Sequence, residues 1–343
     1  MTNDPKGLDL AALQNWLERE RPELVTGPLS ASLITGGKSN LTYTLSAGAR
    51  DYVVRRPPLG HVLATAHDMG REYRVMAALA PTNVPVPQMI AHCEDTEVIG
   101  APFYVMEKVT GTPYGRAAQL EVLGPERTRA ITERMVDTLV ALHAVDYAAV
   151  GLGDFGRPDG YLGRQVARWK KQLVSSTSRE LPGMDELVEH LESNIPANGD
   201  GTIVHGDFRL DNLLVDDRDQ VTAVLDWEMS TLGDPLTDVA VLLAYQQLAE
   251  VAPPSRDGAA MITDAPVAAG YLSRDEVLAR YAERSGRDVS DIGFHLALAF
   301  FKLAVILEGI HYRHSHGQTV GAGFDGIGDM IVPLIAAGRA ASR

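Results

Sequence analysis

Residues 205–212 read His-Gly-Asp-Phe-Arg-Leu-Asp-Asn, and residues 224–228 read Val-Leu-Asp-Trp-Glu. The first stretch places Asp207 and Asn212 in the pattern His-x-Asp-x-x-x-x-Asn, and Asp226 follows Asn212 by fourteen residues. Two carboxylates and an amide at this spacing are specific enough to indicate the fold class, provided that they lie between strands.

The neighbouring sequence predicts those strands. The run 202–204, Thr-Ile-Val, is typical of a short buried strand, and residues 212–215 and 221–225 predict a hairpin with the polar residues 216–220 at its turn. The carboxylates and the amide then lie at strand ends or in the connecting loop. Magnesium-dependent phosphoryl transfer needs such an arrangement. One carboxylate orients and deprotonates the attacking hydroxyl, while an amide and a second carboxylate hold magnesium on the phosphates of ATP.

The bulk composition indicates a globular protein with two lobes. The chain has 343 residues, which is long for a single core, and its apolar content of 45% and charged content of 22% are ordinary. The most apolar run, residues 293–307, is interrupted by Lys302, so we expect no membrane insertion. The N-terminus lacks the apolar core of a signal peptide. Cys93 is the single cysteine, which excludes an intramolecular disulfide and fits a reducing cytoplasm.

Net charge is −14 and is unevenly distributed. Residues 1–109 hold 10 basic and 12 acidic side chains, which leaves 21 and 33 for residues 110–343, so −12 of the −14 lies in the second segment. This balance argues against a nucleic-acid-binding surface. The acidic charge either serves solubility or attracts a cationic substrate.

The first hundred residues predict a small β-rich lobe behind a leading helix at 8–21. Leucines at helical spacing mark that helix, and the expected strands are 29–35, 41–45, 52–55 and 102–106. The loop between the first two strands contains Gly36, Gly37 and Ser39. It is either a plain hairpin or a loop that lays backbone N–H groups and the serine hydroxyl over phosphates.

A cation and a carboxylate in this region predict an ion pair. Strand alternation puts Val53 and Arg55 on one face. We expect Val53 to lie beside adenine and Arg55 at the phosphates. Residues 66–80 predict a helix, and Glu72 falls inside its apolar arc. Because a carboxylate on a buried stripe is costly unless paired, we expect Glu72 to pair with Arg55; the alternative is a surface pair with a neighbouring arginine.

The strand that ends near residue 109 leads into Thr-Gly-Thr-Pro at 110–113, which favours a hinge. We expect the carbonyl of Glu107 and the N–H of Val109 to read the adenine edge there. This assignment rests on position along the chain, because backbone groups would make the contacts.

Over roughly residues 30–320 the chain resembles the aminoglycoside phosphotransferase (choline kinase-like) superfamily of protein-kinase-like folds. Four further segments resemble the branch whose kinase-like domains are fused to, or encoded near, acyl-CoA dehydrogenases. These are Tyr-Val-Val-Arg-Arg-Pro-Pro at 52–58, Ala-His-Asp-Met-Gly-Arg-Glu-Tyr-Arg at 66–74, Val-Pro-Val-Pro at 84–87 and Gly-Asp-Pro-Leu-Thr-Asp at 233–238.

The resemblance implies an α+β, bilobal protein-kinase-like fold. A small antiparallel β-sheet lobe at 1–109 would clamp the nucleotide, and a larger, mainly helical lobe at 110–343 would carry catalysis and the substrate site. ATP and Mg²⁺ are the implied cofactors, and a small-molecule hydroxyl is the implied acceptor. The implied roles are the catalytic base for Asp207, the magnesium ligands for Asn212 and Asp226, the phosphate cation for Arg55 and its partner for Glu72.

Two departures from the wider family carry expectations. Arg55 stands where most relatives of protein kinases have lysine, so the phosphate geometry is expected to differ. Trp227 and Glu228 follow Asp226, where protein kinases have Phe-Gly, and no activation-loop phosphosite is recognisable. Constitutive activity is the simpler expectation.

Several residues keep two interpretations. His205 is expected to be a scaffold residue, and Asp238 either caps a helix or braces the catalytic loop. A basic stripe, comprising Arg164, Arg168 and Lys171, is either a solvated face or a contact for an anionic substrate. The cluster of His311, His314 and His316 is expected at a helix end, with metal binding as the alternative.

We therefore predict a cytoplasmic small-molecule kinase. A hydroxyacyl-CoA-type metabolite is one acceptor, suggested by the branch and the basic stripe. An aminoglycoside or another antibiotic is the alternative, suggested by the acidic lobe. A nucleotide-binding pseudokinase is the alternative from another class, and it is disfavoured because all three catalytic-centre residues are present. The sequence carries no signal for the oligomeric state.

Overall fold

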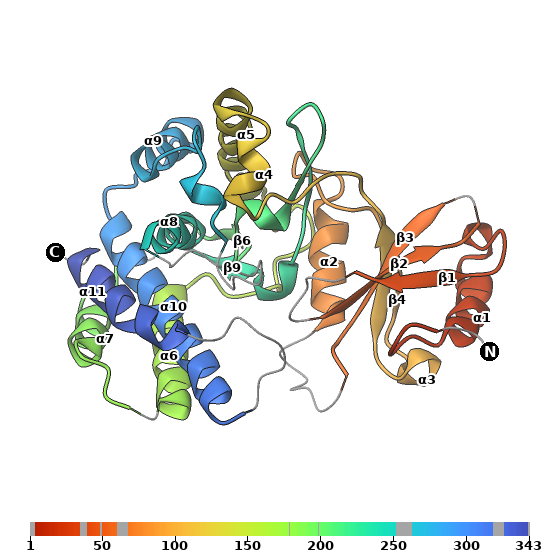
Figure 1. Ribbon diagram of the computed structural model, residues 1–343, viewed down its shortest axis with the longest axis horizontal. Helices are drawn as coiled ribbons and strands as arrows, with labels where there is room; N and C mark the ends of the chain where they lie inside the picture. The colour runs from red at the N-terminus through yellow and green to blue at the C-terminus, as the bar shows by residue number, and fades with distance from the viewer. Residues whose placement is uncertain are drawn as a thin grey trace. The chain divides into compact units, whose positions relative to one another are not determined.

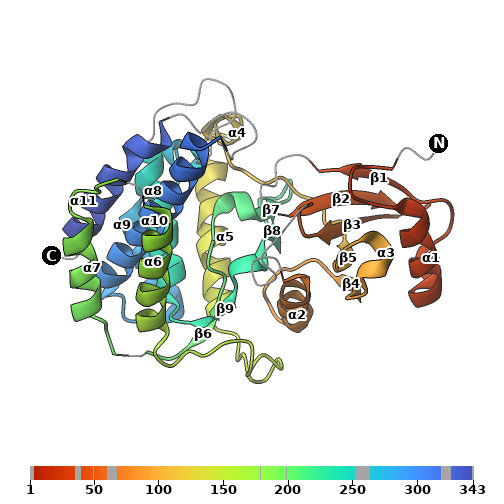
Figure 2. The same ribbon diagram turned by 90° about the horizontal axis from the view of Figure 1, so that it is seen from below.

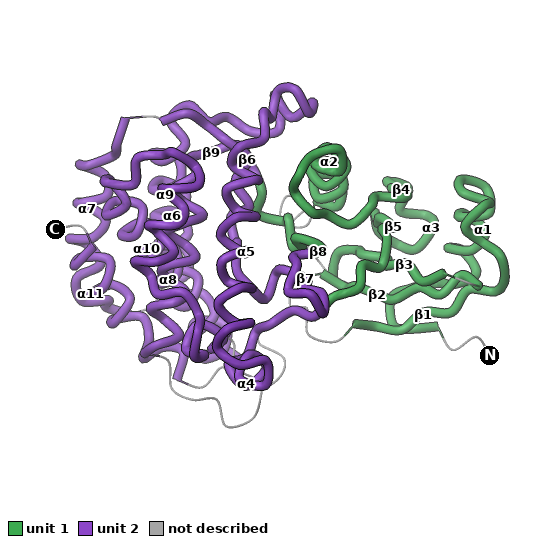
Figure 3. The backbone as a smooth tube through the Cα atoms, turned by 90° about the horizontal axis from the view of Figure 1, so that it is seen from above, with its two compact units in different colours: residues 1–111, 222–230 green, residues 112–221, 231–343 purple. Residues whose placement is uncertain are grey.

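The chain divides into two compact units. The computed structural model describes residues 4–34, 40–48, 50–59, 68–177, 179–197, 199–251, 263–317 and 326–341. Unit 1 comprises Met1–Gly111 and Thr222–Ser230, and unit 2 comprises Thr112–Val221 and Thr231–Arg343 (Figure 3). The segment 222–230, which was expected in the second lobe, thus belongs to unit 1 together with Asp226.

Unit 1 is built on a five-stranded antiparallel sheet with the order β1-β2-β3-β5-β4 (Figure 1). Its strands are β1 (Ser30–Leu33), β2 (Leu41–Ser46), β3 (Asp51–Arg56), β4 (Met89–Cys93) and β5 (Phe103–Glu107). Strands β3 and β5 are adjacent, and their register sets Arg55 opposite Tyr104. Cys93 ends β4 and is buried.

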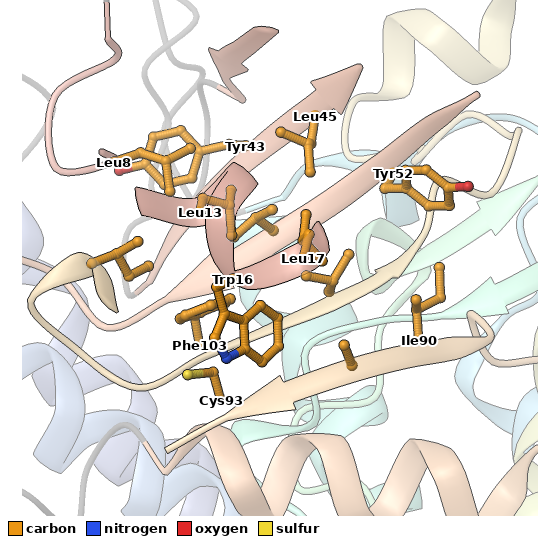
Figure 4. Packing of buried hydrophobic residues seen from close by; sticks show 14 of the residues in the cluster. Leu8, Leu13, Trp16, Leu17, Tyr43, Leu45, Tyr52, Ile90, Cys93 and Phe103 are labelled. Carbon is orange, nitrogen blue, oxygen red and sulfur yellow. The ribbon is translucent and has the colours of Figure 1, made fainter. Parts of the chain in front are cut away.

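Helix α1 (Leu10–Glu20) covers one face of this sheet. The Asp9 carboxylate accepts a hydrogen bond from the Ala12 N–H (2.9 Å) and so caps the helix. Leu13, Trp16 and Leu17 point into the core of unit 1 (Figure 4). The Trp16 ring meets Phe103 edge-to-face at 5.0 Å between centroids. The leading helix predicted at 8–21 is confirmed.

Helix α2 (Met69–Leu79) packs against β4 and β5, and the short α3 (Thr96–Ile99) precedes β5. Asp68 has extended dihedrals, and its carboxylate accepts from the Arg71 N–H (3.0 Å). The prediction that the helix already includes Asp68 was wrong, because this side chain satisfies a free N–H of the first turn instead of continuing the helix. Residues 66 and 67, where we expected it to begin, lie outside the described residues.

Unit 2 is mainly helical. Strand β6 (Thr202–Val204) pairs antiparallel with β9 (Thr231–Gly233). The predicted hairpin is confirmed, with arms β7 (Leu213–Val215) and β8 (Val221–Val224), and the boundary between the units passes through β8. The helices are α4 (Ala117–Glu121), α5 (Pro125–His143), α6 (Tyr161–Ser176), α7 (Met184–Ser193), α8 (Leu236–Val251), α9 (Arg274–Ser285), α10 (Ile292–Ser315) and α11 (Ile331–Ala341).

Helices α8 and α10 are apolar on nearly all sides, which fits their place in the core of unit 2, where they pack against each other and α10 also packs against α6 (Figure 2). Among the described residues, α10 alone is long and apolar enough to cross a membrane, and 72% of its most apolar window is buried inside the protein. A small antiparallel sheet in one unit and a mainly helical second unit confirm the predicted α+β class.

Candidate active site

The predicted base and its amide partner meet in unit 2. Asp207 follows β6 after Gly206, whose φ of +86° turns the chain, and Asn212 ends a 3₁₀ turn (Leu210–Asn212). The Asn212 Nδ2 donates to the Asp207 carbonyl (2.8 Å) and to its Oδ2 (3.2 Å). The Asp207 side chain remains 22% exposed, so a substrate can reach it.

One side chain that the sequence left without a role, Arg209, also contacts this carboxylate. Arg209 Nε lies 3.3 Å from Asp207 Oδ1, and the Arg209 guanidinium lies over the Tyr245 ring, 4.4 Å from its centroid. Burial and the negative charge of Asp207 raise the pKa of Tyr245. Tyr245 belongs to α8, far along the chain, and no sequence signal links it to the motif.

Asp238 braces the loop that carries Asp207. Its Oδ2 accepts from the His205 N–H (2.6 Å) and its Oδ1 from the Gly206 N–H (2.7 Å), while His143 Nε2 lies 3.2 Å away. Burial opposes ionisation of Asp238, but the hydrogen bond and the charge of His143 outweigh it and lower the pKa. Bracing, one of the two interpretations of Asp238, is therefore correct.

His205 is a scaffold residue, as predicted. Its side chain is fully buried, and its Nδ1 accepts from the Asp207 N–H (3.2 Å), which fixes the backbone just before the base. The imidazole also packs edge-to-face against Phe208 at 5.8 Å between centroids.

Unit 1 contains the predicted ion pair. Arg55 Nε lies 3.1 Å from Glu72 Oε2, and the Glu72 side chain is only 1% exposed. Arg55 Nη2 also lies 2.5 Å from Asp226 Oδ1 and 3.9 Å from Glu228 Oε2. One guanidinium thus serves three carboxylates, which leaves a local excess of negative charge around it.

Two polar side chains hold Glu72 in place. The Tyr104 hydroxyl donates to Glu72 Oε2 (2.9 Å) and the Asn40 Nδ2 donates to Oε1 (3.1 Å). Burial raises the pKa of Glu72, although the charge of Arg55 and the Tyr104 hydrogen bond oppose that rise. Sequence reasoning missed Tyr104 because its proximity depends on the register between β3 and β5.

Asp226 adopts a left-handed conformation with φ of +67° and ψ of +57°. Such dihedrals are uncommon for residues other than glycine and concentrate at functional sites. The next residue, Trp227, is buried, and its Nε1 donates to the Val224 carbonyl (2.9 Å). This turn directs the Asp226 carboxylate to Arg55.

Five residues remain from the predicted nucleotide contacts, and the structure describes two of them. Gly36, Gly37 and Ser39 lie outside the described residues. Glu107 ends β5 with an exposed side chain, its N–H donates to the Gln88 carbonyl (2.9 Å), and Val109 follows in the connecting segment. A cavity of about 980 Å³ adjoins both residues, but it also contacts Tyr52 on the α1 face of the sheet, opposite to Arg55. Their adenine contacts stay a prediction.

The donor chemistry fits magnesium. In unit 2 the Asn212 Nδ2 is used by Asp207, which leaves its Oδ1 for a cation, and in unit 1 the Asp226 carboxylate presents hard oxygens of its own. Within the described residues there is no group of three or more His, Cys, Asp or Glu side chains placed to hold a metal. Magnesium commonly binds one or two carboxylates and completes its shell with water and substrate phosphates, so such a group is not required.

Two residues of the basic stripe contact α6 itself or the segment just before it. Arg164 donates to the carbonyls of Asp159 and Arg157, and Arg168 lies 5.4 Å from the centroid of the neighbouring Trp169 ring. Lys171 is exposed. Two residues of the histidine cluster, His311 and His314, lie in the last turns of α10, and His316 is its C-cap and stacks on Tyr312. Their helix-end position is as predicted.

Residues 30–284 match the model of the phosphotransferase enzyme family. The chain belongs to this family. A crystal structure from Ralstonia eutropha, provisionally identified as an aminoglycoside phosphotransferase, is 38% identical, and the match covers 98% of both chains with a TM-score of 0.81. Acyl-CoA dehydrogenase family member 10 from Mus musculus is 38% identical over 314 residues, which are 91% of this chain but 29% of the longer protein.

The aminoglycoside phosphotransferase APH(4)-Ia, solved with AMP-PNP and hygromycin B, shares 15% identity and a TM-score of 0.60 over 97% of this chain. At that identity the likeness shows the fold alone. The resemblance to the aminoglycoside phosphotransferase superfamily and the predicted kinase-like fold are both confirmed.

Proposed function

We propose that this phosphotransferase moves the γ-phosphate of ATP, in a magnesium-dependent reaction, to a hydroxyl group of a small molecule. One observation carries the proposal. The Asp207 carboxylate, reachable from solvent, is fixed by Asn212 through its own side chain and by Asp238 through the preceding backbone. A carboxylate held in one orientation beside an amide oxygen is the arrangement that phosphoryl transfer to a hydroxyl uses.

In the proposed mechanism Asp207 accepts the proton of the acceptor hydroxyl as its oxygen attacks the γ-phosphate. Arg209, beside Asp207, offsets negative charge that develops at the transferred group. Arg55 leaves its contact with Asp226 and binds the α- and β-phosphates, while Glu72 keeps it in place. Magnesium, held by Asn212 and Asp226, would neutralise phosphate charge.

A hydroxylated compound with an acyl chain is the acceptor class that the relatives favour. The curated relatives at 33–38% identity carry the name of acyl-CoA dehydrogenases, and this chain spans less than half of their length. An aminoglycoside is the second candidate, because APH(4)-Ia was solved with hygromycin B and unit 2 carries most of the acidic charge. We also propose a cytoplasmic location, since Cys93 is a free, buried thiol.

The test is a coupled ADP-release screen with Mg-ATP and four acceptor groups: hydroxyacyl compounds as CoA esters and free acids, aminoglycosides, macrolides and choline-like alcohols. Saturable turnover on a hydroxyacyl compound supports the favoured class. Turnover on an aminoglycoside alone would replace it with the second candidate. Thermal stabilisation by Mg-ATP without transfer to any acceptor would indicate a pseudokinase.

A further inference from the structure

A small cavity lies beside the catalytic loop in unit 2. Its volume is about 40 Å³, and it reaches Gly206, the residue before Asp207. Helix α6 contributes Gln165 and Trp169, α8 contributes Val241, and α10 contributes Lys302. A single water needs about 10–15 Å³ of such space, so the cavity has room for a group of several heavy atoms.

Lys302 is a buried cation with few partners. Its Nζ donates to the Gly206 carbonyl (2.7 Å) and lies 5.7 Å from the centroid of the Trp169 ring. Among the described residues, no carboxylate oxygen lies within 4.0 Å of Nζ, the distance limit for an ion pair. An ammonium has three N–H groups to donate, and the described residues accept one of them.

The nearest carboxylates do not supply this missing partner. Both oxygens of Asp238 accept backbone N–H groups, and its Oδ2 also faces His143. Asp207 is engaged by Asn212 and Arg209. Burial lowers the pKa of Lys302, although the charges of Asp207 and Asp238 counteract this. A buried cation without a counter-charge is costly, so this cavity is suited to an anion from outside the chain.

We propose that the Lys302 cavity is a carboxylate subsite, and that the acceptor is therefore a hydroxy acid whose carboxylate binds Lys302 while its hydroxyl lies at Asp207. The inference rests on the proposed phosphotransferase function and narrows the acceptor to the free acid. Lys302 contacts the carbonyl of the residue before Asp207, and the charge of Asp207 acts on its ammonium, so the acceptor that we propose is a short hydroxy acid. A polycationic aminoglycoside would be repelled by the Lys302 ammonium at this position.

The reaction itself leaves the carboxylate unchanged. The hydroxyl oxygen forms a bond to the γ-phosphorus, the bond from that phosphorus to the β,γ-bridging oxygen breaks, and the hydroxyl proton passes to Asp207. Lys302 takes no part in this exchange and acts by holding the acceptor.

The test compares 4-hydroxybutyrate, its thioester and 1,4-butanediol as acceptors with Mg-ATP. We expect wild-type kcat/KM for the acid to exceed that for the diol and the thioester by about 100-fold, the effect of a charge-assisted contact. In Lys302→Met the kcat/KM for the acid should come within about threefold of that for the diol and the thioester, without a change in the KM for ATP. A purely structural role of Lys302 would instead lower turnover on acid and diol alike and preserve their ratio.

Gln165→Glu tests the anion preference of the cavity without removing the contact between Lys302 and the Gly206 carbonyl. The added negative charge should lower the preference for the acid about tenfold, whereas Gln172→Glu, the same change at an exposed position of α6, should leave it intact. Equal kcat/KM for acid and diol in the wild type, or an unchanged ratio in Gln165→Glu, would overturn the inference.

If no acceptor is turned over, the proposed function fails and a binding measurement decides the inference separately. Calorimetry with butyrate should then detect binding to the wild-type protein and not to Lys302→Met. Absence of butyrate binding to the wild type would overturn the subsite.

Discussion

Arg55 is the residue at which the sequence departs most clearly from a lysine-based phosphate site, and its contacts give the reason. Its Nε faces Glu72 while its Nη2 faces Asp226, so two separate nitrogens of one planar group serve two carboxylates. A lysine carries one nitrogen on a flexible stem and can sit close to only one of them. The geometry of this pair therefore depends on arginine and not on positive charge alone.

Arg55→Lys should raise the KM for ATP by about tenfold or more, because one charge-assisted contact of about 1.5–3 kcal/mol is lost. Steady-state kinetics at saturating acceptor measure the change. An unchanged KM for ATP would show that positive charge suffices at this position.

Tyr104 tests whether the support of Glu72 matters for the nucleotide. Tyr104→Phe removes the hydroxyl that donates to Glu72, and we expect a several-fold higher KM for ATP with a loss of about 1–2 kcal/mol in unfolding free energy. Tyr43→Phe is the matched control: it removes a hydroxyl bonded to the Lys6 carbonyl in the same unit, away from Glu72. Equal effects of both variants on the KM for ATP would contradict the positioning role.

Between elements, the first turn of α8 and the loop after β6 form one structure. The Asp238 carboxylate accepts two backbone N–H groups from that loop, and His143 of α5 is its third partner. The other ring nitrogen of His143 lies 2.8 Å from the Tyr281 hydroxyl on α9. Three helices, α8 directly and α5 and α9 behind it, thus support the two residues before Asp207 and keep its backbone in place.

Asp238→Asn should lower kcat about tenfold or more and leave the KM for ATP nearly unchanged, because the loop loses an acceptor while unit 1 is untouched. Its pKa is lower in the folded protein than the ordinary 3.8. The ionised form therefore adds stability above that value, and this contribution is lost as the pH falls through the folded pKa. Chemical unfolding should show that the difference in unfolding free energy between wild type and variant narrows as the pH falls below about 4. A constant difference would contradict the assignment.

Local signals made part of the site predictable. The spacing of Asp207 and Asn212 lies within one loop, and helical periodicity placed Glu72 on a buried stripe where Arg55 was its natural partner. Tyr104, Tyr245 and Lys302 were not predictable, because each reaches the site from a segment distant in sequence. Their positions depend on strand register and helix packing, which no local pattern specifies.

At the scale of the whole molecule, the segment 222–230 matters most. It returns to unit 1 and brings Asp226 to Arg55, while Asp207 and Asn212 belong to unit 2. The sequence predicted two lobes but assigned this segment to the second, since chain order alone gives no sign that a hairpin arm joins the earlier unit.

A fragment of residues 1–111 should unfold with low cooperativity, because it lacks the buried Trp227 and the Val224 N–H that donates to the Pro85 carbonyl (2.8 Å). The Thr222 hydroxyl donates to the Thr110 carbonyl (2.9 Å), so the start of segment 222–230 lies close to the C-terminal end of the fragment. Joining 222–230 to the fragment through a short Gly-Ser linker should restore a cooperative transition in thermal unfolding. Equal transitions with and without the segment would contradict its place in unit 1.

The central claim, that Asp207 is the base of an ATP-dependent phosphotransferase, is tested most directly by Asp207→Asn. Asp217→Asn, the same charge change at an exposed position of the β7–β8 turn, serves as the control. Calorimetry and ADP release should show that Asp207→Asn binds Mg-ATP within about threefold of wild type but transfers phosphate at least about 10³-fold more slowly, while the control retains both. Near-normal transfer by Asp207→Asn would contradict the account.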